Sequence, residues 1–244
     1  MIVSRQSNAA IVPAVMTLAG LAVLVGLGLW QLERKAWKEA LIAQLDRRLS
    51  AAPIALPPPA EWPRLRVGDS EFLRVRLTVQ FANADDALLY TGGSPLRDDI
   101  KSPGYFVLAP GRLPSGEQVV VNRGFAADRT YPRPSGSLDI VGVLRWPEAP
   151  SWFVADHDSG GSIWFVRDPG KMAQVRNWGP VAPFYIEQES PVPEGGSPRP
   201  AALKVRLRND HLQYALTWFS LAGVLAAVFA VWWSSRRRAN EPAG

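Results

Sequence analysis

Two long stretches without a charged side chain set the strongest limit on how this chain can fold. They are residues 9–32, AAIVPAVMTLAGLAVLVGLGLWQL, and residues 212–233, LQYALTWFSLAGVLAAVFAVWW. A helix needs about 20 predominantly apolar residues to cross the hydrocarbon core of a bilayer. The sequence therefore predicts two transmembrane helices with a water-soluble domain between them.

Each stretch has an alternative explanation. The first could be a cleaved signal peptide, but its apolar run exceeds the roughly 7–15 residues of a signal-peptide core, and LWQLERKAW supplies no small-residue cleavage site. The second could be the buried core helix of a soluble protein, although SSRRR directly after it is typical of the end of a membrane span. Two membrane spans remain the prediction.

The chain then divides into six segments. In order, these are a tail at 1–8, a transmembrane helix at 9–32, an amphipathic stalk helix at 33–49, a β-rich domain at 50–203, a juxtamembrane segment with the second transmembrane helix at 204–233, and a tail at 234–244. The stalk is predicted to be helical because Trp37, Leu41 and Leu45 recur every four residues. Proline-rich segments at 50–63 and 190–201 are expected to be linkers into and out of the domain.

The central segment is predicted to be a mainly antiparallel β domain, barrel-like or sandwich-like, with one short helix. Apolar and polar residues alternate along EFLRVRLTVQF, residues 71–81, with one slip near Leu73. Six further short runs, each bounded by Gly, Pro, Asp or Ser, lie at 87–93, 104–110, 118–126, 138–146, 162–168 and 183–190. Short strands at this spacing are typical of an antiparallel barrel or sandwich. The short helix is expected at 169–178, which has a proline near its start and a glycine after its end.

Charge and cysteine content exclude several classes of site. The net charge is +5, but the basic surplus lies in the tails and the flanks of the spans, where anionic lipid headgroups would attract it. The central segment is near neutral, so nucleic-acid binding has little electrostatic support. With no cysteine, the chain has no disulfide, zinc thiolate site or cysteine nucleophile. The cluster at residues 236–238 favours cytoplasmic termini, although a count of basic residues at the span ends does not decide the orientation.

Few residues suggest catalysis. His157 lies between Asp156 and Asp158 and could be a metal ligand or a general base, but no second histidine accompanies it in the central segment. A solvated loop histidine is therefore the preferred interpretation. The serines of DSGG and PSGS lack the strand–turn–helix context of a nucleophile elbow. We expect no enzyme here, although carboxylates converging from distant loops would revive a periplasmic hydrolase.

The segment VVVNRGF, residues 119–125, supports two interpretations equally. It could be a strand that ends in a turn, with Arg123 solvated. It could instead place Arg123 on one loop face with YPRPSG, residues 131–136, to contact a partner protein. The candidate partner-binding residues are Asn122, Arg123, Gly124, Phe125 and Tyr131.

His211 stands where a polar segment becomes apolar, in RNDHLQYALTWF. A capping box of Asp210 and Gln213 predicts a helix that begins near His211 and brings His211, Tyr214 and Trp218 onto one face. These could be interfacial anchors, which composition favours. An ionisable group at membrane depth also suggests a functional site.

An antiparallel first span would bring Trp30, Gln31 and Arg34 to the level of His211. An imidazole beside aromatic rings, with arginines at the edge of the bilayer, has the elements of a haem site. The imidazole would bind iron, and Arg34, Arg206 or Arg208 would pair with the propionates.

Three segments together resemble the surfeit locus protein family, the cytochrome c oxidase assembly factors. They are LGLWQLERKAWKEALI, GYFVLAPGRLPSGEQVVVNRGF and NDHLQYALTWF, and the layout with two spans covers nearly the whole chain. Phe125 departs from the family, which usually has tryptophan after Asn-Arg-Gly. This exchange keeps an aromatic surface but loses the indole donor.

The resemblance implies an assembly factor for a haem-copper terminal oxidase in a bacterial or mitochondrial inner membrane. No Arg/Ser-rich transit segment precedes the first span, which favours a bacterium. The family layout implies cytoplasmic termini and a periplasmic domain. The implied partners are the catalytic subunit of the oxidase, haem A synthase and the lipid bilayer.

The implied cofactor is haem A, because His211 matches the histidine of the family's second span. The expected cofactor-binding residues are His211, Tyr214, Trp218, Trp30, Arg34 and Arg208, with His211 as the iron ligand. The alternative function is a cofactor-free membrane scaffold that stabilises oxidase assembly intermediates. A haem absorption spectrum would separate the two.

Overall fold

The computed structural model describes residues 5–81, 83–94, 97, 99–134, 136–148, 155–158, 160–204 and 208–239. The chain divides into two compact units. One unit is a helix pair, Met1–Ala43 with Leu207–Gly244, and the other is a β domain, Gln44–Arg206.

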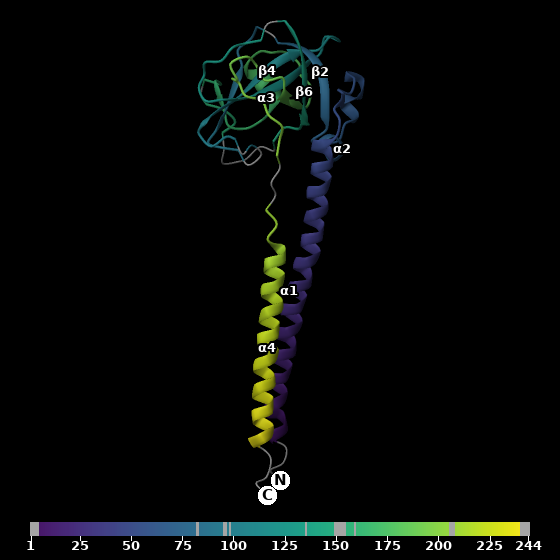
Figure 1. Ribbon diagram of the computed structural model, residues 1–244, viewed down its shortest axis with the longest axis vertical. Coiled ribbons are helices and arrows are strands. Elements are labelled where there is room, and N and C mark those ends of the chain that lie inside the picture. The colour runs from purple at the N-terminus through teal and green to yellow at the C-terminus, as the bar shows by residue number, and fades with distance from the viewer. Residues whose placement is uncertain are drawn as a thin grey trace. The chain divides into compact units, whose positions relative to one another are not determined.

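The helix pair consists of α1 (Arg5–Ser50) and α4 (His211–Ala239), which lie side by side (Figure 1). They run antiparallel, because Gly20 meets Leu225 and Gly28 meets Phe219. The covered positions of both helices include a set that recurs alternately three and four residues apart, which is the spacing of a coiled-coil seam. They are Leu21, Leu24, Gly28, Gln31, Lys35 and Lys38 in α1, and His211, Ala215, Trp218, Ala222, Leu225 and Phe229 in α4.

Both helices are long and apolar enough to cross a membrane. Their most apolar windows have mean hydropathies of 2.2 and 1.9, and only 6% and 11% of these windows are buried. A core helix of a soluble protein would be mostly buried, so that alternative for residues 212–233 is wrong. The two helices support a membrane protein. Helix α1 continues without a break to Ser50, and its division into a span and a stalk stays a prediction.

Five strands of the β domain close into a ring, in the order β2–β6–β8–β5–β4 and back to β2. Their bounds are β2 Arg74–Phe81, β4 Gly104–Arg112, β5 Gln118–Ala126, β6 Ser137–Arg145 and β8 Tyr185–Ser190. Outside the ring, β3 (Ala87–Thr91) pairs with β4, β7 (Ile163–Trp164) pairs with β3, and β1 (Ile54–Ala55) pairs with β2.

Most of these pairings are antiparallel, which confirms the mainly antiparallel, barrel-like prediction. Each of the seven predicted runs overlaps one of the strands β2 to β8. The parallel pairings β1–β2, β3–β7 and β5–β8 were not expected.

Two hydrophobic cores lie on the two faces of β5. Val119 and Val121 belong to the core inside the ring, together with Phe184. Val120 belongs to an outer core with Trp164 and Met172, which is covered by β3, β7 and the short helix α3 (Pro169–Val175). Because both faces are buried, this strand is a continuous apolar run rather than an alternating one.

The two predicted linkers are packed against the domain. Trp62, in the short helix η1 (Pro59–Arg64), is 8% exposed and meets the ring of Phe184 edge to face at 5.3 Å. In the exit segment, Arg199 exchanges two backbone hydrogen bonds with Phe125, of 3.0 and 2.7 Å. Proline content therefore marked these segments as irregular but did not reveal their contacts.

The first predicted strand begins later than expected, after the short helix α2 (Val67–Ser70). Phe72 has a φ of 65°, and both Phe72 and Leu73 bond to Leu144 of β6. Two residues of one strand that lie opposite a single residue of the neighbouring strand form a β-bulge. The bulge is the physical reason for the slip in alternation near Leu73.

Candidate functional site

His211 is the first residue of α4, and its imidazole contacts α1. Its Nδ1 lies 2.7 Å from the side-chain oxygen Oε1 of Gln31. An amide oxygen can only accept a hydrogen bond, so this contact is a hydrogen bond when Nδ1 carries the proton, and in the neutral ring that leaves the lone pair on Nε2. A histidine that binds a metal through Nε2 is held in this way, with its other N–H donated to an oxygen.

A pocket of about 450 Å³ opens beside this histidine, where the polar end of the helix pair meets its apolar part. This volume lies within the range of small-molecule sites. The pocket offers an imidazole, a phenol, two cations and one carboxylate. It is lined by Gln31, Lys38, Arg208, Asp210, His211 and Tyr214.

Three of the six residues predicted to bind the cofactor line this pocket, namely His211, Tyr214 and Arg208. The other three do not. Trp30 is 53% exposed, and Arg34 lies over the ring of Trp37 at 4.1 Å. Trp218 is half-buried in the seam between the helices, and Arg206 lies outside the described residues.

Gln31 and Lys38 were not among the predicted cofactor-binding residues. They lie seven residues apart on the face of α1 that also carries Gly28, so the seam spacing would have identified both. The helix begins at His211 as expected. Asp210, the predicted cap, pairs its carboxylate with Arg208.

The candidate partner-binding residues 122–125 lie inside the β domain. Asn122 is fully buried, donates to Glu187 Oε1 at 2.9 Å and accepts from the Gly124 N–H at 3.1 Å. Gly124 has a φ of 115°, and a Cβ there would overlap the Arg199 backbone. Phe125 is 7% exposed and packs on Phe106.

Arg123 is neither solvated nor on an exposed face. It is 5% exposed and donates to the Pro132 carbonyl at 2.8 Å. Its guanidinium lies 3.8 Å from Asp86 Oδ2 and 5.8 Å from the ring centroid of Tyr131. The structure thus brings Arg123 and the loop that begins at Tyr131 together, as one of the two interpretations expected. It does so by burying the arginine, so that its side chain is not available to a partner.

Asp86 lies at the centre of this cluster and was missed from the sequence. Arg133, at 3.7 Å, is its second cation. Burial raises the pKa of the Asp86 carboxyl, against the lowering effect of the two arginines. Burial and the neighbouring Asp86 carboxylate raise the pKa of Tyr131. The cluster is a buried ionic contact that joins the segment before β3, the strand β5 and the following loop.

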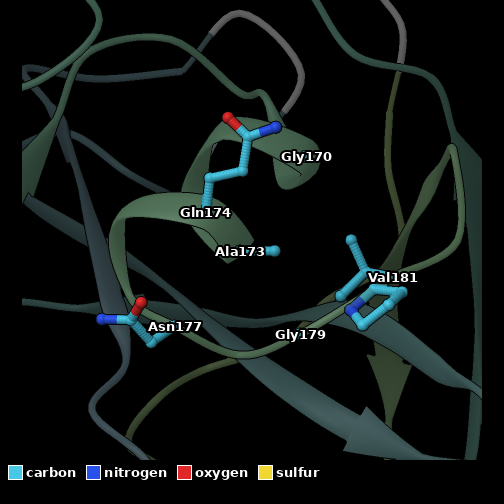
Figure 2. A pocket seen from close by; sticks show the side chains of 7 residues that line it. Gly170, Ala173, Gln174, Asn177, Gly179 and Val181 are labelled. Atoms are coloured by element: carbon cyan, nitrogen blue, oxygen red, sulfur yellow. The ribbon is translucent and has the colours of Figure 1, made fainter.

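A pocket of about 490 Å³ lies beside α3 in the β domain (Figure 2). Figure 2 shows Gln174 and Asn177 on one side of it and Val181 on the other. No acidic, basic or nucleophilic side chain is among its lining residues, so the pocket offers amide hydrogen bonds and no general acid or base. These residues are Gly170, Ala173, Gln174, Asn177, Gly179, Pro180 and Val181.

His157 is half-buried rather than fully solvated. Its ring lies 4.7 Å from that of Trp164, and its Nδ1 lies 2.6 Å from the carbonyl oxygen of Asp158. Across the part of the chain that the structure describes, no three His, Asp or Glu side chains gather as a metal site.

Comparison with known proteins decides the family. The chain matches the model of the SURF1 family over residues 18–223, which includes most of α1, the β domain and the first half of α4. The chain belongs to the SURF1 family. The SURF1-like protein of Monosiga brevicollis is 32% identical over 238 residues, covering 91% of this chain and 87% of that protein.

Two mammalian relatives are similar at comparable levels. Surfeit locus protein 1 of Rattus norvegicus is 30% identical over 229 residues, covering 86% of this chain and 71% of that protein. Surfeit locus protein 1 of Homo sapiens is 30% identical over 228 residues, covering 85% and 72%. The resemblance seen in three sequence segments is confirmed as SURF1 membership. These relatives are eukaryotic, and a bacterial source for the chain stays a prediction.

Proposed function

We propose that this SURF1-family protein is an assembly factor for a haem-copper terminal oxidase and that it binds haem A in the pocket beside His211. The observation that carries the proposal is the contact between His211 Nδ1 and Gln31 Oε1 at 2.7 Å. It leaves Nε2 as a free ligand atom at the border between the apolar and polar parts of the helix pair. Membership of the SURF1 family supports the role in assembly.

The pocket has the donor set that a haem requires. His211 supplies a nitrogen ligand, and Lys38 and Arg208 supply cations for two carboxylates. Tyr214 is 55% exposed beside them, and the apolar surface of α4 continues below. When bound, haem A would supply an iron centre that the imidazole of His211 could ligate.

We infer that α1 and α4 both span the inner membrane of a bacterium, with cytoplasmic termini and a periplasmic β domain. Their length and hydropathy support the two spans. A reporter active only in the periplasm should give a signal when fused after Gly196 and none when fused at Gly244. The reversed pattern would overturn this topology and the placement of the pocket at the periplasmic border.

The partners in this proposal are the catalytic subunit of the oxidase and haem A synthase. Residues 122–125 are buried, so they cannot present their side chains to either partner. The candidate contact is therefore the loop that begins at Tyr131, in which Pro132 and Arg133 are exposed.

The experiment is a titration of haem A into purified variants, followed by the Soret band. His211→Ala should remove or strongly weaken binding without preventing membrane insertion, because alanine is readily accommodated in a helix. His157→Ala is the matched control and should bind as the parent does. If His211→Ala also binds as the parent does, the cofactor-free scaffold becomes the better function.

A further inference from the structure

Gln31 lies in the seam between the two helices, and its side chain crosses the seam to His211. We propose that Gln31 is a positioning residue for His211. Its side-chain oxygen holds the Nδ1–H, fixes the tautomer of the ring and leaves Nε2 to bind a ligand in the pocket. The identity of that ligand rests on the proposed function, whereas the tautomer does not.

The backbone geometry near Gln31 explains why its side chain reaches the ring. Less than one turn along α1, Gly28 has no side chain, and the ring of Phe219 occupies the space that a Cβ would need. The two helices therefore approach closely at this level. A glutamine at the next seam position spans the remaining gap, and hydrogen bonds between side chains of adjacent helices stabilise helix pairs in membranes.

The contact decides which nitrogen of His211 can act. A free neutral imidazole in water favours the tautomer that carries its proton on Nε2, and that proton would occupy the ligand atom. Oε1 of Gln31, the amide atom that faces Nδ1, can only accept, so the contact favours the tautomer protonated on Nδ1. Histidines that bind metals almost always donate their second ring N–H in this way, and the partner fixes ring orientation and ligand basicity.

The position of Gln31 relative to the cations of the pocket fits the same role. Lys38 lies two turns further along α1, about 10 Å away along the helix axis. Arg208 precedes α4 and pairs with Asp210. The imidazole thus lies at the apolar end of the pocket and the cations lie at its polar end. A haem requires this arrangement, because its macrocycle is apolar and its propionates are charged.

The first test compares three variants of the full-length protein in haem A titrations. Gln31→Leu removes the acceptor and should weaken binding about 10-fold to 100-fold. Gln31→Glu keeps an acceptor oxygen at the same reach and should restore affinity towards that of the parent. Gln213→Leu is the control, because it makes the same change at an exposed position of α4 outside the pocket lining. Parent-like binding by Gln31→Leu would overturn the positioning role and leave the proposed function intact.

The second test needs no haem. The chain has two histidines, so ¹⁵N-histidine labelling gives two pairs of imidazole nitrogen signals, and His211→Ala assigns them. In the parent, His211 should carry its proton on Nδ1, and in Gln31→Leu the Nε2–H tautomer should become the major one. If the parent does not bind haem A but the major tautomer still changes between the parent and Gln31→Leu, the haem proposal is rejected and the positioning role is kept. An Nε2–H tautomer in the parent would reject the positioning role itself.

Discussion

The ring of Phe219 fills the space beside Gly28, so that a Cβ on Gly28 would lie 2.6 Å from the ring carbon Cζ. Real Cβ atoms do not approach other atoms so closely, so the half-buried ring of Phe219 would have to move. This contact sets the spacing of α1 and α4 at the level just below Gln31 and His211. Changes at Gly28 should therefore affect both the stability of the helix pair and the site.

Gly28→Ala should lower the free energy of unfolding by about 1–3 kcal/mol, the usual cost of overpacking. Gly26→Ala is the matched control, because a Cβ at Gly26 has no atom within 4 Å. That variant should be neutral or gain up to about 1 kcal/mol from helix propensity. Thermal unfolding in detergent measures both, and equal effects would show that Phe219 does not pack on Gly28.

Gly124→Ala should be more harmful to the β domain than Gly116→Ala. Both glycines have positive φ angles, 115° and 102°, so both alanine variants carry backbone strain of about 1–3 kcal/mol. At Gly116 a Cβ meets no atom within 4 Å, whereas at Gly124 it would overlap the Arg199 backbone. The midpoint of thermal unfolding should therefore drop further for Gly124→Ala. Equal drops would mean that the exit segment is not held against β5.

Arg123→Ala should destabilise the protein at pH 7, because it leaves the Asp86 carboxylate buried with one cation fewer. Removing a partner from a buried ion pair costs about 3–5 kcal/mol, and the remaining Arg133 places the expected loss near the lower end. Asp86→Asn in the same chain should restore part of the loss. An Arg123→Ala protein with parental stability would show that the pair contributes nothing.

The loss of stability caused by Arg123→Ala should become smaller as the pH falls. The folded-state pKa of Asp86 is raised by burial above its ordinary value of 3.8. Its contribution to stability is therefore fully present below about pH 4 and is lost as the pH rises through the raised pKa. Unfolding midpoints of the parent and Arg123→Ala, measured from pH 7 to pH 4, should converge. A constant difference would contradict the burial of an ionised Asp86.

Asp99 should contribute to acid unfolding. A hydrogen bond from the buried Arg97 is the main cause that lowers the pKa of Asp99 to about 2. This contribution is present above about pH 4 and is lost as the pH falls through about 2. Asp99→Asn should flatten that part of the stability profile and cost about 1 kcal/mol at pH 7, because Asp99 is partly exposed. If the stability of Asp99→Asn fell with decreasing pH in the same way as that of the parent, the pairing of Asp99 with Arg97 would be ruled out.

Local patterns were sufficient to predict the strands β2 to β8 and the apolar helices. Each strand is bounded by residues that favour turns, and each apolar helix is longer than a bilayer requires. The pattern could not show which strands become neighbours, because β5 and β8 pair in parallel across a long stretch of chain. The two-residue strand β1 is too short for any periodicity to reveal.

The contacts of the candidate site residues were harder to predict than the elements that carry them. The level along α1 groups Trp30, Gln31 and Arg34, but which residues of α1 face α4 depends on the seam spacing, which points to Gln31 and Lys38. The sequence left open whether Arg123 is solvated or faces a partner, because its carboxylate partner Asp86 lies 37 residues earlier in the chain. A charged residue inside an apolar strand requires a buried counterion, and only the folded chain shows where that counterion is.

The ring of the β domain closes where β2 meets β4, through the pairs Gln80↔Arg112 and Phe81↔Gly111 of the described chain. By contrast, β2 pairs with β6 along almost its whole length, from Arg74 to Gln80. Cooperative opening of a protein starts where few contacts must be broken. Backbone amides at this short junction should exchange with deuterium well before those of residues 119–121. Opening of the junction would turn the closed barrel into an open sheet while the two hydrophobic cores stay shielded from water.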